Sequence, residues 1–138
     1  IFEMTETAAL ADMVAARHLM EAINDIGCQF ALDDFGTGFS SFYYLKTLPF
    51  EFVKIDGSFI NRLADRKDDQ VLVKAMGEIA RAFGKRTIAE QVEDPQALAL
   101  LAEYGIDYAQ GYFIGRPIPI TDVLEAGSSA NRDAAMSG

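Results

Sequence analysis

The sequence has very few of the residues that build disulfide bonds or zinc sites. Cys28 is the only cysteine among the 138 residues, and His18 is the only histidine. A single cysteine excludes an intrachain disulfide, and one cysteine with one histidine cannot complete the ligand set of a structural zinc ion. These absences favour a reducing, cytoplasmic location.

Long apolar runs and basic residues are also scarce. No apolar stretch approaches the roughly 18–20 residues that a helix needs to cross a bilayer, and no signal peptide is recognisable. Lys and Arg total 12 against 21 Asp and Glu, a net charge of −9, which argues against binding DNA through a basic face. A phosphate-containing ligand remains compatible with this charge if metal cations lie between ligand and protein.

An initiator methionine is missing, because the chain begins at Ile1, and we therefore expect further residues upstream. The 138 residues, half of them hydrophobic, suffice for one domain with its own core. Short apolar runs alternate with helical periodicity. Strands are expected near residues 1–2, 28–33, 52–55, 86–90 and 107–109. Helices are expected at 7–26, before Pro49, from Asp68 or Asp69 to Gly84, and from Asp94 to Gly105.

Polar residues follow the apolar runs at the expected strand ends. They are Glu3, Glu6, Asp33, Asp34, Lys54, Asp56, Glu90, Glu93 and Gln110. Strands that alternate with helices form a parallel sheet, whose carboxyl ends meet at one edge. The pattern therefore predicts an α/β fold with a site at that edge.

The local motif with most information is Asp33-Asp34, followed by glycines at 36 and 38. Adjacent carboxylates at a strand end can serve two metal ions or bridge them, and Mg²⁺ and Mn²⁺ prefer such oxygen ligands. The alternative is an Asx-type turn that ends the strand.

The other polar residues have structural alternatives too. Lys54 could hold a water molecule or stabilise charge on a phosphate, or it could pair with Asp56 or with an acid of a neighbouring strand. Glu90 and Glu93 could be ligand, base or support, or simply a solvated strand end. Gln110 could read a base edge, orient water or occupy a turn.

Several segments together resemble the EAL-domain family of cyclic-di-GMP phosphodiesterases. They are Glu3, Thr5 and Glu6 (ExTE), DDFGTGFSS (33–41), KIDGSF (54–59), AEQVE (89–93) and QGYFIGRP (110–117). The resemblance implies that residues 1–120 are the C-terminal portion of an EAL domain, with about five strands of a TIM-like barrel. Residues 121–138 would then be a short helix and a disordered tail.

The resemblance also implies a reaction, the hydrolysis of cyclic di-GMP to linear pGpG with two Mg²⁺ or Mn²⁺ ions. The implied metal ligands are Glu3, Asp33, Asp34 and Glu90. Lys54 would position the attacking water, and Glu90 is the candidate general base, a role that metal-activated water can also take. Gln110, Glu93 and Pro117 would border the substrate. Glu6 would anchor the loop 36–41, which in the family links metal binding to dimer contacts.

The sequence departs from the family pattern at its beginning. The glutamate of the Glu-Ala-Leu signature and an asparagine ligand would both lie upstream of Ile1, so we expect an active enzyme in the intact protein and little activity from residues 1–138 alone. Gln91 stands where the family usually has glycine. A receptor that binds cyclic di-GMP without cleaving it is the alternative function, and an inert interaction fragment is a third.

The resemblance finally implies partners. We expect a homodimer formed through residues 36–44, and sensory, receiver or GGDEF domains upstream. An upstream segment could also attach the intact protein to a membrane.

Overall fold

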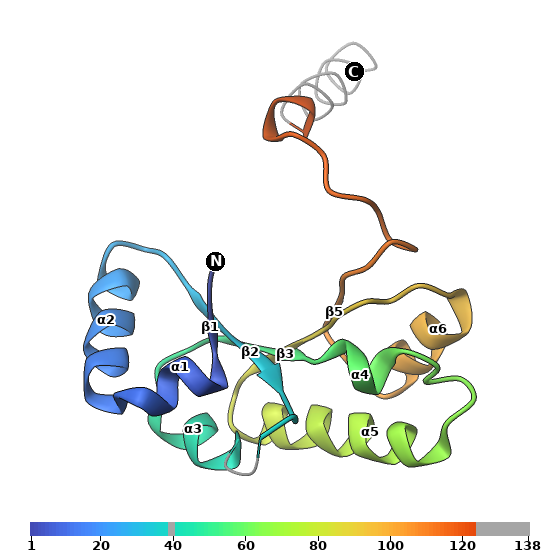
Figure 1. The fold of residues 1–138 in the computed structure, drawn as a ribbon, viewed down its shortest axis with the longest axis horizontal. Coiled ribbons are helices and arrows are strands. Elements are labelled where there is room, and N and C mark those ends of the chain that lie inside the picture. Colours follow the sequence, from blue (N-terminus) through green and yellow to red (C-terminus); the bar gives the residue numbers. More distant parts are fainter. Residues whose placement is uncertain (39–40, 124–138) are drawn as a thin grey trace, which may run out of the picture.

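The sheet of the protein has five parallel strands, which follow one another in space as they do in sequence (Figure 1). The structure is a computed structural model and describes residues 1–38 and 41–123. The strands are β1 (Phe2–Thr5), β2 (Phe30–Phe35), β3 (Phe52–Ile55), β4 (Arg86–Ala89) and β5 (Tyr108–Ala109). The predicted α/β class is confirmed.

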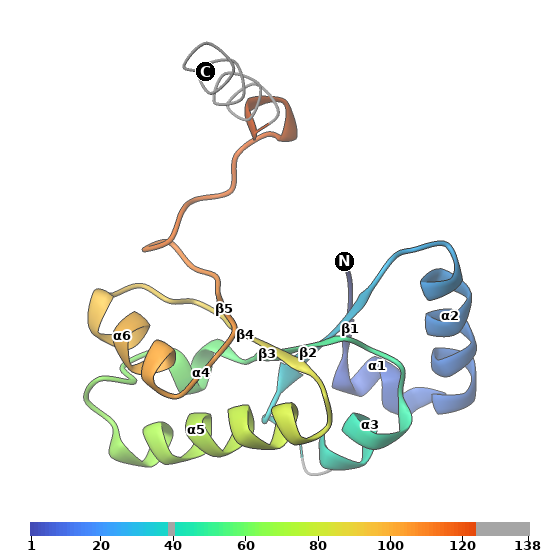
Figure 2. The same ribbon diagram turned by 180° about the vertical axis from the view of Figure 1, so that it is seen from behind.

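Helices flank the sheet on one side and at both ends. They are α1 (Glu6–Ala11), α2 (Met13–Asp25), α3 (Ser41–Thr47), α4 (Gly57–Ile60), α5 (Lys67–Ala82) and α6 (Pro95–Glu103). In both opposite views, α3 and α5 lie beneath the strands, α1 and α2 lie at one end, and α4 and α6 lie at the other (Figures 1 and 2). Within the described part of the chain, no helix combines the length and apolar character needed to cross a membrane.

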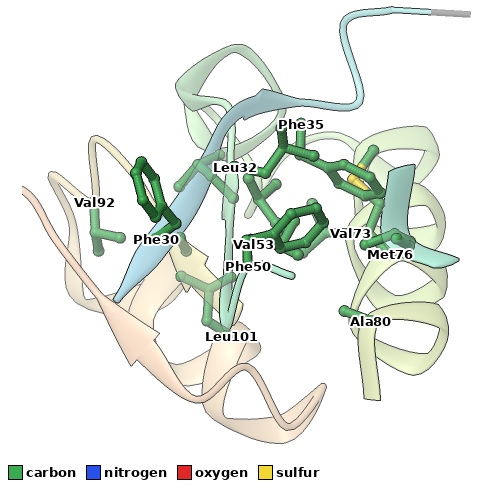
Figure 3. Packing of buried hydrophobic residues seen from close by; sticks show 14 of the residues in the cluster. Phe30, Leu32, Phe35, Phe50, Val53, Val73, Met76, Ala80, Val92 and Leu101 are labelled. Atoms are coloured by element: carbon green, nitrogen blue, oxygen red, sulfur yellow. The ribbon is translucent and has the colours of Figure 1, made fainter. Parts of the chain in front are cut away.

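The hydrophobic core lies between the sheet and α5 (Figure 3). Leu32 of β2 and Val53 of β3 are fully buried there, against Val73, Met76 and Ala80 of α5. Because strand side chains alternate between the two faces, Lys54 projects from the opposite face of the sheet. The core thus fixes the face on which the polar residues gather.

The expected helix 7–26 is two helices. Asp12 has an extended backbone (φ −155°, ψ 91°), and its carboxylate accepts hydrogen bonds from the amides of Val14 and Ala15. It therefore ends α1 and caps α2, a role that aspartate commonly takes. Strand β2 begins and ends two residues later than expected and includes both Asp33 and Asp34.

The chain after β5 leaves the sheet on the side away from α5 (Figures 1 and 2). It forms a helical turn at 120–123, close to the short helix expected from residue 121. The disordered tail expected after that helix lies outside the described residues.

Lys85 lies directly before β4, at the end of the sheet opposite the polar residues, and binds backbone carbonyls there. Its ammonium group donates to the carbonyl of Phe50 at 2.6 Å and lies 4.6 Å from the Phe50 ring centre. Burial lowers the pKa of Lys85, with Glu51 opposing that shift. The Lys85 ammonium therefore loses its proton at lower pH in the folded protein than in the unfolded chain, where its pKa is about 10.4. The free energy of unfolding consequently rises with pH just below that value.

Lys85→Met is accordingly expected to lower the free energy of unfolding by about 1–2 kcal/mol at neutral pH, because buried carbonyls lose their donor. The deficit should grow as the pH rises toward about 10. Urea denaturation across this pH range measures it, with the exposed Lys74→Met as control. A deficit that shrinks with rising pH would contradict the assignment.

Candidate functional site

The ammonium group of Lys54 lies at the centre of a carboxylate cluster built from neighbouring strands. Its Nζ atom is 2.9 Å from Glu3 Oε1 of β1 and 3.0 Å from Asp33 Oδ1 of β2. It is 2.6 Å from Glu90 Oε1, directly after β4. Parallel pairing brings these groups together, because β3 pairs with β2 on one side and β4 on the other. Of the alternatives for Lys54, the pairing with acids of neighbouring strands is the one observed.

The electrostatics of the cluster are strongly coupled. The Lys54 side chain is only 4% exposed; burial alone would lower its pKa, but pairing with Glu90, Glu3 and Asp33 outweighs burial and raises it. Burial raises the pKa of Glu90 despite the opposing effect of Lys54. Several carboxylates thus share one ammonium group, which leaves an excess of negative charge that a cation would neutralise.

A β-bulge brings Asp34 into the same site. The pairing of β2 with β3 shifts between Leu32 and Phe35, so that Asp33 and Asp34 together stand opposite Lys54. Asp34 has a left-handed backbone with φ 59°. In a regular strand, adjacent side chains would point to opposite faces. The bulge instead lets both carboxylates reach one site and returns Phe35 to the core.

Asp33, Asp34 and Glu90 fit a divalent cation. Each offers a carboxylate oxygen, and these oxygens lie within 4.8 Å of one another. Asp33 Oδ1 is buried, and the donor that contacts it among the described residues is the Lys54 ammonium, at 3.0 Å but in poor hydrogen-bond geometry. A buried carboxylate oxygen without a well-aligned donor is unusual, and coordination to a hard cation such as Mg²⁺ or Mn²⁺ would satisfy its remaining lone pairs. Glu3, half exposed at the edge of the cluster, can approach the same ion.

Two further acids have local contacts. Glu6 is buried, and its carboxylate packs so closely on Gly38 that a Cβ at residue 38 would lie 2.5 Å from Glu6 Oε1. This contact joins the start of α1 to the glycine-rich loop. Residues 39–40 of that loop lie outside the described residues. Asp56 caps α4 by accepting from the amide of Ser58 at 3.0 Å.

A cavity of about 400 Å³ opens beside the cluster. Its lining residues are Glu90, Gln91, Glu93, Gln110, Gly111 and Tyr112. Pro117 lies in an adjoining hollow that shares Gln110 and Tyr112, and Arg116 stacks on the Tyr112 ring at 4.4 Å. The predicted substrate-binding residues therefore lie next to the predicted metal ligands. Gln91 and Tyr112 also line the cavity, although sequence reasoning assigned them no role; their place beside Glu90 and Gln110 was the available signal.

The fold and the cluster define a class of protein. It is an α/β protein of the TIM-barrel type, with a carboxylate and lysine site at the carboxyl ends of its parallel strands. Within that class, the EAL domain family model matches residues 1–117. The chain belongs to the EAL domain family.

Individual relatives agree with this assignment. The chain is 43% identical to the cyclic di-GMP phosphodiesterase PdeB of Shewanella oneidensis over 124 residues, which are 90% of this chain and 14% of PdeB. The EAL domain of Mycobacterium smegmatis DcpA superposes with a TM-score of 0.82 at 35% identity, over 90% of this chain and 56% of that domain. The PaMucR phosphodiesterase in complex with c-di-GMP gives a TM-score of 0.79 at 38% identity, over 88% and 49%.

Proposed function

We propose that the intact protein hydrolyses one phosphodiester bond of cyclic di-GMP and releases linear pGpG. The observation that carries the proposal is the convergence of Glu3, Asp33 and Glu90 on Lys54, with Asp34 beside them. The similarity to PdeB supports the substrate. The adjoining cavity offers the side chains of Gln91, Glu93 and Gln110 to a nucleotide.

The roles proposed for the residues of the cluster follow from their positions. Glu3, Asp33, Asp34 and Glu90 would hold two Mg²⁺ or Mn²⁺ ions. Such ions, when bound, activate water and stabilise the charge on the attacking and leaving oxygens of phosphodiester hydrolysis. Lys54 would orient the attacking water and neutralise negative charge that develops on the phosphate, because its ammonium lies among the proposed ligands. Glu90 would accept the proton of that water. Gln110, Glu93 and Pro117 would hold the nucleotide.

The activity would require the rest of an EAL domain. The chain spans 56% of the solved DcpA domain and a much smaller share of PdeB. Helices cover only one face of the five-stranded sheet, and on the other face Tyr108 of β5 is 48% exposed. We therefore propose that residues 1–138 alone have little activity.

The proposed partners follow the same reasoning. A second copy of the chain would dock through residues 36–44, where Tyr43 is 60% exposed and where the glycine-rich loop contacts Glu6. Sensory, receiver or GGDEF domains would control the site from other parts of the intact protein. The site itself would work in the cytoplasm.

Metal removal tests the proposal. The intact protein with Mg²⁺ or Mn²⁺ is expected to convert cyclic di-GMP to pGpG, followed by anion-exchange chromatography, and excess EDTA should abolish the conversion. Activity should return when Mg²⁺ is added back, which controls for unfolding. Binding without conversion, measured by calorimetry, would instead identify the receptor. Conversion that persists in EDTA would reject the metal site.

A further inference from the structure

Gln91 has an unusual backbone at the wall of the cavity. Its φ is 52°, in the left-handed region, which residues with a side chain rarely adopt. The neighbouring residues hold it there. The amide of Glu90 donates to the carbonyl of Ile55 at 3.2 Å, and the amide of Val92 donates to the carbonyl of Gln110 at 3.0 Å. Val92 itself is fully buried, so the position of Gln91 is fixed on both sides.

The side chain of Gln91 is exposed on one side and in close contact with the protein on the other. It packs on Gly57 at the start of α4, and a Cβ at residue 57 would overlap the amide carbon of Gln91. The absence of a side chain at Gly57 therefore makes room for the amide. Despite this placement, the amide makes no hydrogen bond to any residue that the structure describes. An exposed amide, packed on Gly57 and without a hydrogen-bond partner among the described residues, thus lines the cavity next to Glu90.

We infer that Gln91 is a specificity-determining residue whose side-chain amide hydrogen-bonds the base edge of a nucleotide in the cavity. The inference rests on the proposed function, which supplies the nucleotide. An amide presents a donor and an acceptor side by side, as base edges do. Gln91 is the residue directly after Glu90. In this proposal Glu90 serves the reacting centre and Gln91 contacts the base. The left-handed residue is exposed, and its side chain lines the cavity and not the hydrophobic core.

The test separates base recognition from phosphodiester chemistry. Gln91→Ala in the intact protein is expected to raise KM for cyclic di-GMP about tenfold with kcat within about twofold, because the contact is made equally in ground and transition states. Hydrolysis of bis(para-nitrophenyl) phosphate, which has no base, should be unchanged. Gln91→Asn, which keeps an amide but shortens its reach, should lie between. Gln96→Ala, the same change on the exposed side of α6, should have no effect on either substrate.

A double-mutant cycle tests the part played by Gly57. Gly57→Ala should raise KM in the wild-type background by displacing the amide, and should add little in the Gln91→Ala background. An unchanged KM in Gln91→Ala, or an equal loss on both substrates, would overturn the inference while the proposed function stands. If the wild type binds cyclic di-GMP without cleaving it, Kd replaces KM in every arm. If the wild type neither binds nor cleaves it, the proposed function fails and the inference falls with it.

Discussion

Replacing Asp33 with asparagine is expected to abolish metal-dependent hydrolysis of cyclic di-GMP. Asp33 contributes a buried oxygen that the Lys54 ammonium contacts at 3.0 Å without a well-aligned hydrogen bond, and its neighbour Asp34 belongs to the same bulge. Asparagine has one neutral oxygen in place of a carboxylate, so the site loses a negative charge and one of its two ligand oxygens at this residue. Since metal ions contribute several kcal/mol to such reactions, turnover should fall by about a thousandfold or more.

The same variant should fold normally without metal. Asparagine has the shape of aspartate and removes one of several carboxylates around Lys54, so the metal-free melting temperature should change little. The stabilisation that Mg²⁺ or Mn²⁺ gives the wild type should disappear in Asp33→Asn, as measured by thermal melts with and without metal. Asp25→Asn, the same change at the exposed end of α2, is the control. Normal turnover in Asp33→Asn would reject the metal assignment.

Replacing Lys54 with methionine should give the opposite pattern of stability and metal binding. Methionine keeps the length of the side chain but leaves Glu3, Asp33 and Glu90 without their cation. The metal-free protein should lose about 3 kcal/mol of stability, the cost typical of removing one partner from a buried ion pair. Added Mg²⁺ should restore most of it, because the ions neutralise the same oxygens and no longer compete with an ammonium group.

Turnover of Lys54→Met should nevertheless stay about a hundredfold to a thousandfold below that of the wild type, because the variant lacks the ammonium that we propose orients water and balances phosphate charge. Thermal melts and pGpG release, each with and without Mg²⁺, measure the two effects on one preparation. Lys74→Met, an exposed lysine of α5, is the control. Should Lys54→Met bind metal more weakly than the wild type, Lys54 would be supporting the ligands and not competing with the ions.

Local signals in the sequence predicted much of the fold. Strand β3 has the predicted bounds, and α6 begins where Asp94 and Pro95 indicate a helix start. The carboxylate of Asp94 accepts from the amides of Gln96 and Ala97, as a capping residue should. These features depend on neighbouring residues, so the sequence alone defines them. The gathering of Glu3, Asp33 and Glu90 around Lys54 was predictable as well, because the topology of parallel strands requires it.

Features that depend on contacts between distant segments could not be predicted. The bulge at Asp33 and Asp34 exists because β2 pairs with β3, and no local pattern distinguishes it from a regular strand end. The place of Gln91 depends on Gly57, more than thirty residues earlier in the chain. The break at Asp12 was the exception, since an aspartate that caps a helix is a local signal that the apolar periodicity of 7–26 concealed.

The extra residue in β2 has a consequence for how the strand can change in length. If Asp34 were deleted, Leu32 and Phe35 would keep their places in the core, and the ladder with β3 would become continuous. The shortened strand would be free of its left-handed residue, and it would carry a single acid in place of two. The irregular pairing therefore allows this sheet to place two adjacent acids at one point. A change that made the strand regular would remove one of these acids before it disturbed the core.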